Sequence, residues 1–221
     1  MKLIPILLTF GILAVSGWAE DYKPEPYSAE LVKKAEEGDA EAQYNLGQCY
    51  ENGQVGIKDN KQAVKWYTKS AEQGYAKTAF ALSRCYEDGK GVPRDKNEAK
   101  KWFIKGVESN DESELLRILE SIYYEGGEGG EEKKSLLYRR LAELGNVKAQ
   151  RELIGCNLNQ VDRKEAMEWL TKAAEQGDAE AQFKLGQHYQ RGSGEAVKWF
   201  TKAAEQGNES AKKELEQLKS N

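Results

Sequence analysis

The sequence predicts an all-α protein, a right-handed alpha-alpha superhelix (a solenoid) of about five helical hairpins with a half-repeat at each end. A motif of 30 to 36 residues recurs along the chain, which is typical of repeat architectures. Within each copy the apolar residues are spaced four apart, so they share one stripe of a helix. A single hairpin cannot bury both of its faces, so the copies are expected to stack.

The composition lies close to the range of disordered chains. The 221 residues carry a formal net charge of −4, and 32% of them are charged. Beyond residues 1–19, only 33 of 202 residues are Leu, Ile, Val or Phe, about 16%. A fraction of these residues below roughly 20% is typical of disordered chains. Alanines and aromatics remain as core material. This balance argues against a polytopic membrane protein and a nucleic-acid binder driven by bulk charge.

Residues 1–19 have the features of a secretion signal. Lys2 precedes an apolar run from Leu3 to Val15, and small residues occupy the −3 and −1 positions of Gly17-Trp18-Ala19. The run is about 13 residues long, too short to span a bilayer, although an uncleaved N-terminal anchor is the alternative. We therefore expect an exported protein, periplasmic or secreted, with no membrane span after signal removal. Residues 20–27 are predicted to form a short extended linker.

Residues 28–221 are predicted to form the solenoid, which opens with a lone helix over 28–37 and closes with a polar helix over 209–219. In the first copy, helices are expected at about 40–51 and 61–73. Asp39, Asp95, Asp178 and Asn208 are predicted to cap helix N-termini. The following glycines can adopt positive φ and are predicted to end the first helix of a copy: Gly53, Gly89, Gly91, Gly192 and Gly194.

Stacking places equivalent residues of the copies in columns. The first helices supply an alanine column (Ala42, Thr78, Glu114, Ala149, Ala181, Ala211) and a leucine column (Leu46, Leu82, Ile118, Leu153, Leu185, Leu215). The second helices supply a tryptophan column (Trp66, Trp102, Leu137, Trp169, Trp199). The third copy lacks this tryptophan and carries an acidic glycine loop at 125–132. It is therefore predicted to be the least stable part of the solenoid.

Two segments carry the repeat most clearly: AEAQYNLGQCYENG with AVKWYTKSAEQG (within 40–74), and AEAQFKLGQHYQRGSGEAVKWFTKAAEQG (179–207). They resemble the SEL-one-like (Sel1-like) repeat family, a branch of the tetratricopeptide-like solenoids, over about residues 28–219. The resemblance implies an adaptor or scaffold that binds another protein or peptide, without enzymatic activity or cofactor. We expect no nucleic-acid partner. The protein is expected to be a monomer.

In such solenoids the first helices line a concave groove. On each first helix the predicted groove positions lie roughly 140–160° from the stacked stripe. The residues predicted to contact a partner are Tyr44, Gln48, Phe80, Arg84, Arg151, Phe183 and Gln187. Aromatics beside amides and arginine suit a peptide. The alternative is that Tyr44, Phe80 and Phe183 pack against a neighbouring repeat.

The three cysteines, Cys49, Cys85 and Cys156, share one column with Ser121 and His188. Stacked helices lie about 8–10 Å apart, whereas a disulfide needs Cα atoms within about 7 Å. Small buried side chains are therefore expected, with a bridge, a metal site or a reactive thiol as alternatives. The acidic loop has no EF-hand spacing, so it is interpreted as a solvated loop and no metal is expected.

The same resemblance raises a competing class, because cysteine-rich members of the family are associated with penicillin binding or β-lactamase activity. A hydrolase of cell-wall or β-lactam compounds is therefore the alternative function. Ser210-Ala-Lys-Lys213 matches Ser-x-x-Lys once, but the companion motifs Ser-Asp-Asn and Lys-Thr-Gly do not occur. His188 is the only histidine, and no catalytic residue is predicted. A structural envelope protein without a defined partner is a third possibility.

Overall fold

The computed structural model describes residues 26–125, 129–155 and 163–219. Every regular element in these ranges is a helix. Helices α1 (Ala29–Glu36) and α12 (Glu209–Lys219) stand alone at the two ends. Between them lie five hairpins: α2 (Ala40–Asn52) with α3 (Asn60–Glu72), α4 (Ala76–Asp88) with α5 (Lys96–Val107), α6 (Glu112–Glu125) with α7 (Gly130–Glu143), α8 (Val147–Glu152) and the 3-10 turn η1 (Leu153–Gly155) with α9 (Arg163–Glu175), and α10 (Ala179–His188) with α11 (Gly194–Glu205). The predicted all-α solenoid is confirmed.

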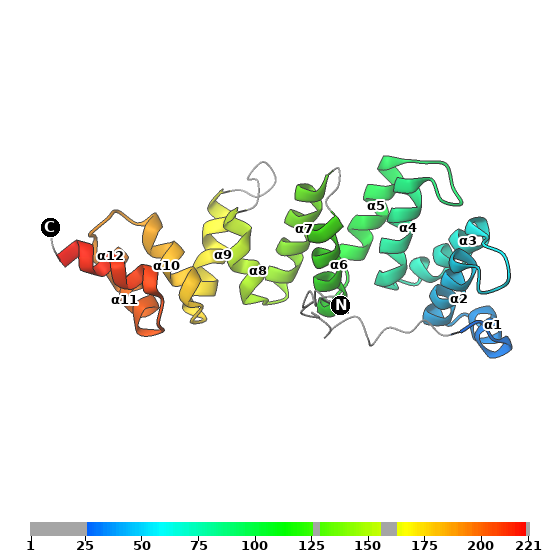
Figure 1. Cartoon of the computed structure of the whole chain (residues 1–221), viewed down its shortest axis with the longest axis horizontal. Coiled ribbons are helices and arrows are strands. Elements are labelled where there is room, and N and C mark those ends of the chain that lie inside the picture. Colours follow the sequence, from blue (N-terminus) through cyan, green and yellow to red (C-terminus); the bar gives the residue numbers. More distant parts are fainter. Residues whose placement is uncertain (1–25, 126–128, 156–162, 220–221) are drawn as a thin grey trace, which may run out of the picture.

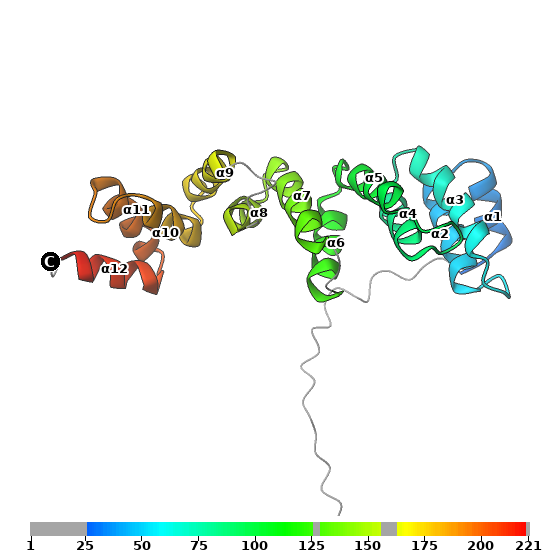
Figure 2. The ribbon, with the colours of Figure 1, turned by 90° about the horizontal axis from the view of Figure 1, so that it is seen from above.

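The hairpins form one elongated row, with α1 and α12 at opposite ends (Figures 1 and 2). Each helix packs closely on the next helix along the chain, with one exception. Helix α6 packs on α7 but not closely on α5, and α5 reaches across to α7 instead. The stacking is therefore looser between the second and third hairpins than elsewhere in the described chain.

Helix ends follow the capping residues that the sequence predicts. Asp39 accepts a hydrogen bond from Ala42 N at 2.6 Å, and Asp178 accepts one from Ala181 N at 2.7 Å. Asp95 accepts two, and Asn208 accepts one from Ala211 N. These side chains satisfy backbone N–H groups that have no partner within the helix.

Of the five glycines predicted to end a first helix, Gly53 and Gly89 do so, whereas α10 ends at His188 with Tyr189 as its C-cap. Gly53 (φ 76°) and Gly89 (φ 72°) are left-handed C-caps of α2 and α4, and Gly91 and Gly192 also have positive φ. Gly194 was wrongly assigned as a helix terminator. It is the first residue of α11, directly after the N-cap Ser193.

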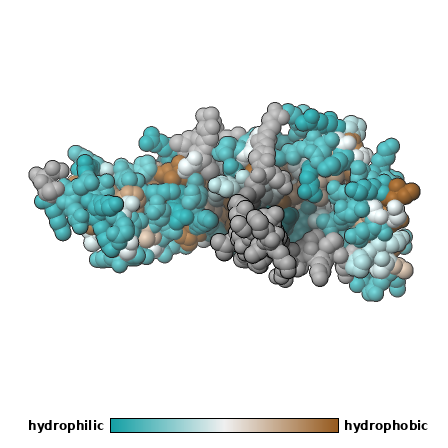
Figure 3. Space-filling view, in the orientation of Figure 1, coloured by the Kyte–Doolittle hydropathy of each residue, from teal (hydrophilic) through white to brown (hydrophobic). Residues whose placement is uncertain are grey.

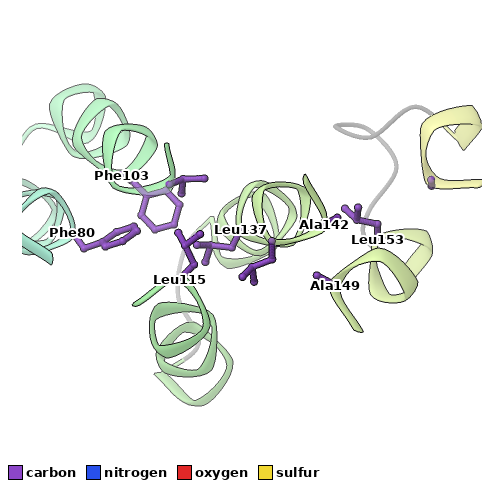
Figure 4. Packing of buried hydrophobic residues seen from close by; sticks show 10 residues of the cluster. Phe80, Phe103, Leu115, Leu137, Ala142, Ala149 and Leu153 are labelled. Carbon is purple, nitrogen blue, oxygen red and sulfur yellow. The ribbon is translucent and has the colours of Figure 1, made fainter. Parts of the chain in front are cut away.

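The predicted columns form the core. Every member of the alanine column is buried, and so are Leu46, Leu82, Leu153 and Leu185 of the leucine column. In the third copy Leu115 is fully buried, whereas Ile118 is only partly buried. Figure 4 shows the central cluster, in which Phe80, Phe103, Leu115 and Leu137 converge from the four helices of the second and third hairpins.

The four tryptophans of the column share an additional contact. Lys69, Lys105, Lys172 and Lys202 each lie over the indole three residues before them, at 4.2, 4.6, 4.0 and 4.7 Å from the ring centroid. Trp102 and Trp199 are buried, whereas Trp66 and Trp169 are partly exposed. The lysine covers what remains of the ring face, so the column is stabilised by burial and by cation–π attraction.

Buried glutamines join the hairpins at three points. Gln43, Gln150 and Gln182 donate Nε2 hydrogen bonds to the carbonyls of Ala35, Ala142 and Ala174 at 3.0, 3.2 and 3.0 Å. Their Oε1 atoms accept from Gln73, Gln176 and Gln206 at 2.8, 2.9 and 2.8 Å. The second and third copies carry Ala79 and Leu115 in place of the buried glutamine.

Candidate functional site

The aromatic residues predicted to contact a partner pack against neighbouring helices. Tyr44 and Phe80 are each 7% exposed, and Phe183 is half-buried. The ring of Tyr44 lies 5.9 Å from that of Tyr67, and Phe80 lies 5.4 Å from Phe103 in an edge-to-face arrangement. Phe183 lies 5.8 Å from Phe200. The packing alternative therefore describes these three rings, although two of them also line a cavity.

The four polar members of the predicted set have different surroundings. Arg84 and Gln187 are exposed on α4 and α10. Gln48 donates Nε2 to the hydroxyl of Tyr44 at 2.8 Å. Arg151 contacts both carboxylate oxygens of Asp178, at 3.1 and 3.0 Å, and therefore joins α8 to the N-cap of α10. Their role in partner binding remains a prediction.

One cavity brings together three of the seven predicted residues. It has a volume of about 260 Å³ and lies between α4 and α6, with walls from α2, α5 and α7. Gln48, Arg151, Phe183 and Gln187 do not line it. Its lining residues are Tyr44, Lys77, Phe80, Ala81, Ser83, Arg84, Glu87, Asp88, Phe103, Arg117, Ile118, Ser121, Ile122 and Lys133.

A second cavity of about 480 Å³ adjoins the first, between the end of α4, the start of α5 and α7. Its lining residues are Glu87, Asp88, Arg94, Lys96, Asn97, Lys100, Phe103, Ile122, Gly129, Gly130, Glu132, Lys133 and Leu136. Five residues line both cavities: Glu87, Asp88, Phe103, Ile122 and Lys133. The two cavities are therefore parts of one opening between the second and third hairpins, which we call the central groove.

The third copy, which lies beside this opening, departs from the first and fifth copies at a position of close helix packing. A Cβ on Gly47 would lie 2.5 Å from the Tyr67 ring, and one on Gly186 would lie 2.7 Å from Phe200, so these glycines permit close helix approach. The third copy has Leu119 at the same register, and α6 and α7 pack less closely than α2 and α3. The groove was missed from the sequence, although the irregular third copy was a signal for it.

Charges around the central groove are mostly basic. Of the described residues that line it, seven are lysines or arginines and three are acidic (Lys77, Arg84, Arg94, Lys96, Lys100, Arg117 and Lys133 against Glu87, Asp88 and Glu132). Lys133 pairs with Glu87 across the groove, and Lys100 contacts Glu132 at 2.6 Å. Arg117 pairs with the buried Glu114 through two hydrogen bonds. Arg84 and Arg94 are exposed and form no ion pair with any residue that the structure describes.

The remaining candidates for chemistry lie apart from one another. Cys49 and Cys85 are buried, as expected, and no disulfide joins them. Burial raises the pKa of the Cys85 thiol to about 11, which suppresses the reactive thiolate. Cys156 lies outside the described residues. His188 is exposed at the end of α10, and Ser210 and Lys213 are exposed on α12.

Within the described ranges, no cluster of three His, Cys, Asp or Glu side chains has the arrangement of a metal site. None of the helices described there is both long and apolar enough to cross a membrane. The face shown in Figure 3 is mostly hydrophilic where it is coloured, with hydrophobic residues only in isolated spots. The predicted signal (1–19), most of the linker (20–27) and part of the acidic loop lie outside the described residues.

Comparison with known proteins assigns the family. The model of the Sel1 repeat matches residues 40–75, 76–111, 158–178 and 179–208, which is more than half of the chain. The chain therefore belongs to the Sel1 repeat family. The match omits residues 112–157, which contain the third hairpin beside the central groove.

Two solved structures are similar to this chain in sequence. The chain is 30% identical to c5321, a protective antigen of uropathogenic Escherichia coli with an SLR fold, over 82% of this chain and 41% of that one (TM-score 0.44). It is 31% identical to a Sel1 repeat protein from Oxalobacter formigenes, over 83% and 80% (TM-score 0.43). This chain thus spans less than half the length of the Escherichia coli protein. No curated protein matches the chain.

Proposed function

We propose that this protein is an exported adaptor or scaffold that binds another protein or peptide through its concave face. Sel1 repeat proteins typically act as protein-interaction scaffolds, and this chain has that repeat. The observation that carries the proposal is the cavity between α4 and α6, where Tyr44, Phe80 and Arg84 meet. A cavity with an aromatic wall and an unpaired guanidinium at its edge suits recognition of a peptide.

Capture of partners from the producing cell tests the binding role. Phe80 belongs to the core, so its removal would also disturb folding; Arg84 and Gln187 are exposed and are better residues to change. We expect the unaltered protein to retain specific partners and the Arg84→Ala/Gln187→Ala variant to retain less of them. Lys65→Ala on α3 is the matched control. Equal capture by all three proteins would show that the concave face does not bind the partner.

Export is a separate part of the proposal, supported by the features of residues 1–19. We expect the mature protein, recovered from the periplasm or the medium, to begin at Glu20. Deletion of residues 2–19 should leave it in the cytoplasm. N-terminal sequencing of fractionated protein measures both outcomes, and an exported protein that keeps Lys2 would indicate an anchor.

The hydrolase alternative gains no specific support from the described residues, because Ser210 and His188 are exposed on different helices. We expect no turnover of a chromogenic cephalosporin by the purified protein. Turnover that is lost in Ser210→Ala would overturn the proposed function.

A further inference from the structure

We propose that the central groove is the docking site for an acidic, extended segment of the partner protein. This inference rests on the proposed function and specifies where on the solenoid the partner binds and what chemistry it presents. The groove lies at the one junction between consecutive helices, among those described, that does not pack closely.

Charge complementarity identifies the occupant. Of the described side chains that line the groove, seven are basic and three are acidic, whereas the whole chain has a net charge of −4. The groove is therefore a local basic region on an acidic protein. An acidic segment is attracted to the groove and repelled by the rest of the surface, which favours binding in this place alone.

The groove also offers an apolar wall. Phe103 and Ile122 line both cavities, Phe80 and Ile118 line the smaller one, and Leu136 lines the larger one. Consecutive side chains of an extended peptide point in opposite directions. A segment that alternates acidic with apolar residues could therefore place carboxylates toward the basic rim and apolar groups on this wall.

Arg84 and Arg94 are the residues best placed to bind carboxylates. They line different cavities of the groove, and neither forms an ion pair within the described structure. An arginine can hold a carboxylate through two parallel hydrogen bonds. Between them Lys133 pairs with Glu87 and lies 5.3 Å from the centroid of the Phe103 ring. Carboxylates of the partner can therefore meet Arg84 in the smaller cavity and Arg94 in the larger one.

A nucleic acid would also carry negative charge, but the rest of the molecule disfavours it. Outside the groove acidic residues outnumber basic ones, so a long phosphate backbone leaving the groove would meet repulsion. A short acidic peptide can remain within the basic region. We therefore favour a peptide and use nucleic acid as a competing probe in the test.

The test is a selection from a displayed library of random twelve-residue peptides on the immobilised mature chain. We expect enriched peptides to be net acidic with interspersed apolar residues. Binding of the best peptide, followed by fluorescence anisotropy, should weaken about tenfold or more in Arg84→Gln/Arg94→Gln. It should also weaken when NaCl rises, because salt screens partly exposed charges.

The matched control is Lys65→Gln/Lys213→Gln, which removes the same charge from exposed lysines of α3 and α12 away from the groove. It should bind the peptide as the unaltered protein does. Circular dichroism of both variants should show unchanged helix content, since all four residues are exposed.

The possible outcomes separate the two proposals. The central groove would be rejected as the docking site of an acidic segment by either of two results. The enriched peptides could be neutral or basic, or they could bind the Arg84→Gln/Arg94→Gln variant with unchanged affinity. Neither result would contradict the proposed function. Failure to enrich any peptide would count against the proposed function itself. Tighter binding of an oligonucleotide than of the acidic peptide would also overturn the inference.

Discussion

Gly47 shows how a single residue sets the distance between two helices. Its missing side chain makes room for the ring of Tyr67, whose hydroxyl donates a hydrogen bond to Glu51 Oε2 at 2.6 Å. Tyr67 is completely buried, so a shift of its ring would disturb the side chains packed around it. The same relation recurs between Gly186 and Phe200 in the fifth copy.

We predict that Gly47→Ala lowers the free energy of unfolding by about 1–3 kcal/mol, because the added methyl overpacks the α2–α3 contact. Alanine is otherwise the better helix former by up to about 1 kcal/mol. Gly194→Ala is the control, since a Cβ at that residue meets nothing within 4 Å; it should be neutral or slightly stabilising. Urea unfolding measures both, and stabilisation by both variants would contradict the packing argument.

The buried thiol of Cys85 is expected to make the folded protein less stable at alkaline pH. Burial raises the pKa of its thiol from 9.0 to about 11, so between these values the unfolded chain loses a proton that the folded chain keeps. Because the folded state then binds more protons, its stability decreases as the pH rises through this window. Burial also raises the pKa of the Tyr67 hydroxyl, which acts in the same direction.

We expect the free energy of unfolding to fall on the order of 1–2 kcal/mol between pH 8.5 and 11 through Cys85. In Cys85→Ala the fall should be smaller by that amount, whatever the variant's stability at pH 8.5. Unfolding in urea at several pH values measures the difference in slope. Parallel pH profiles for the two proteins would show that the thiol keeps an ordinary pKa.

At the scale of helices, the paired glutamines connect elements that are not adjacent in sequence. Gln182 of α10 joins the end of α9, through Ala174 O, to Gln206 after α11. Gln182 is 4% exposed, whereas Gln206 is exposed to solvent. Loss of the buried partner should therefore cost more than loss of the exposed one.

We predict that Gln182→Ala lowers the free energy of unfolding by about 1–3 kcal/mol and Gln206→Ala by less. The double variant should be less destabilised than the sum of the two, because the shared hydrogen bond can be lost only once. Urea unfolding of the four proteins completes the cycle. Strict additivity would show that the amide pair does not contribute as a unit.

The third hairpin is the least supported element in the row. Its alanine-column position holds the buried Glu114, its tryptophan is replaced by Leu137, and α6 does not pack closely on α5. Regions with fewer packing contacts open at a lower free energy than the rest of a protein.

We predict that native-state hydrogen exchange of α6 is faster than that of α4, at equal temperature and pH. Each has interior amides within one helix of similar length, so α4 is a suitable internal reference. Mass spectrometry after short exchange times measures both in one sample. Equal protection would show that the groove does not weaken the third hairpin.

At the scale of the whole molecule, the hairpins form a row in which most packing joins neighbours in sequence (Figure 1). A compact protein of the mature length would have a radius of gyration of about 17 Å. We predict a clearly larger value by small-angle X-ray scattering, with the mass of a monomer. A compact particle or a dimeric mass would contradict this shape or the expected oligomeric state.

The sequence by itself determined the fold class, because columns of alanine, leucine and tryptophan at fixed intervals allow few structures other than stacked hairpins. The helix bounds and N-caps followed from local rules, in which Asp39 and Asp178 bond to backbone groups three residues away. The burial of Cys49 and Cys85 followed from their register. Such features depend on residues close in the chain or on identical positions of successive copies.

The tertiary structure alone decided where the repeat opens. Tyr44, Phe80 and Phe183 share one register in the sequence, which predicts the same exposure for all three. Their actual exposure depends on rings in other helices. The central groove likewise joins Arg84 of α4, Arg94 before α5 and Lys133 of α7, which no spacing rule relates. It arises because the irregular third copy fails to stack closely on the second, and such a failure is a property of two packed surfaces.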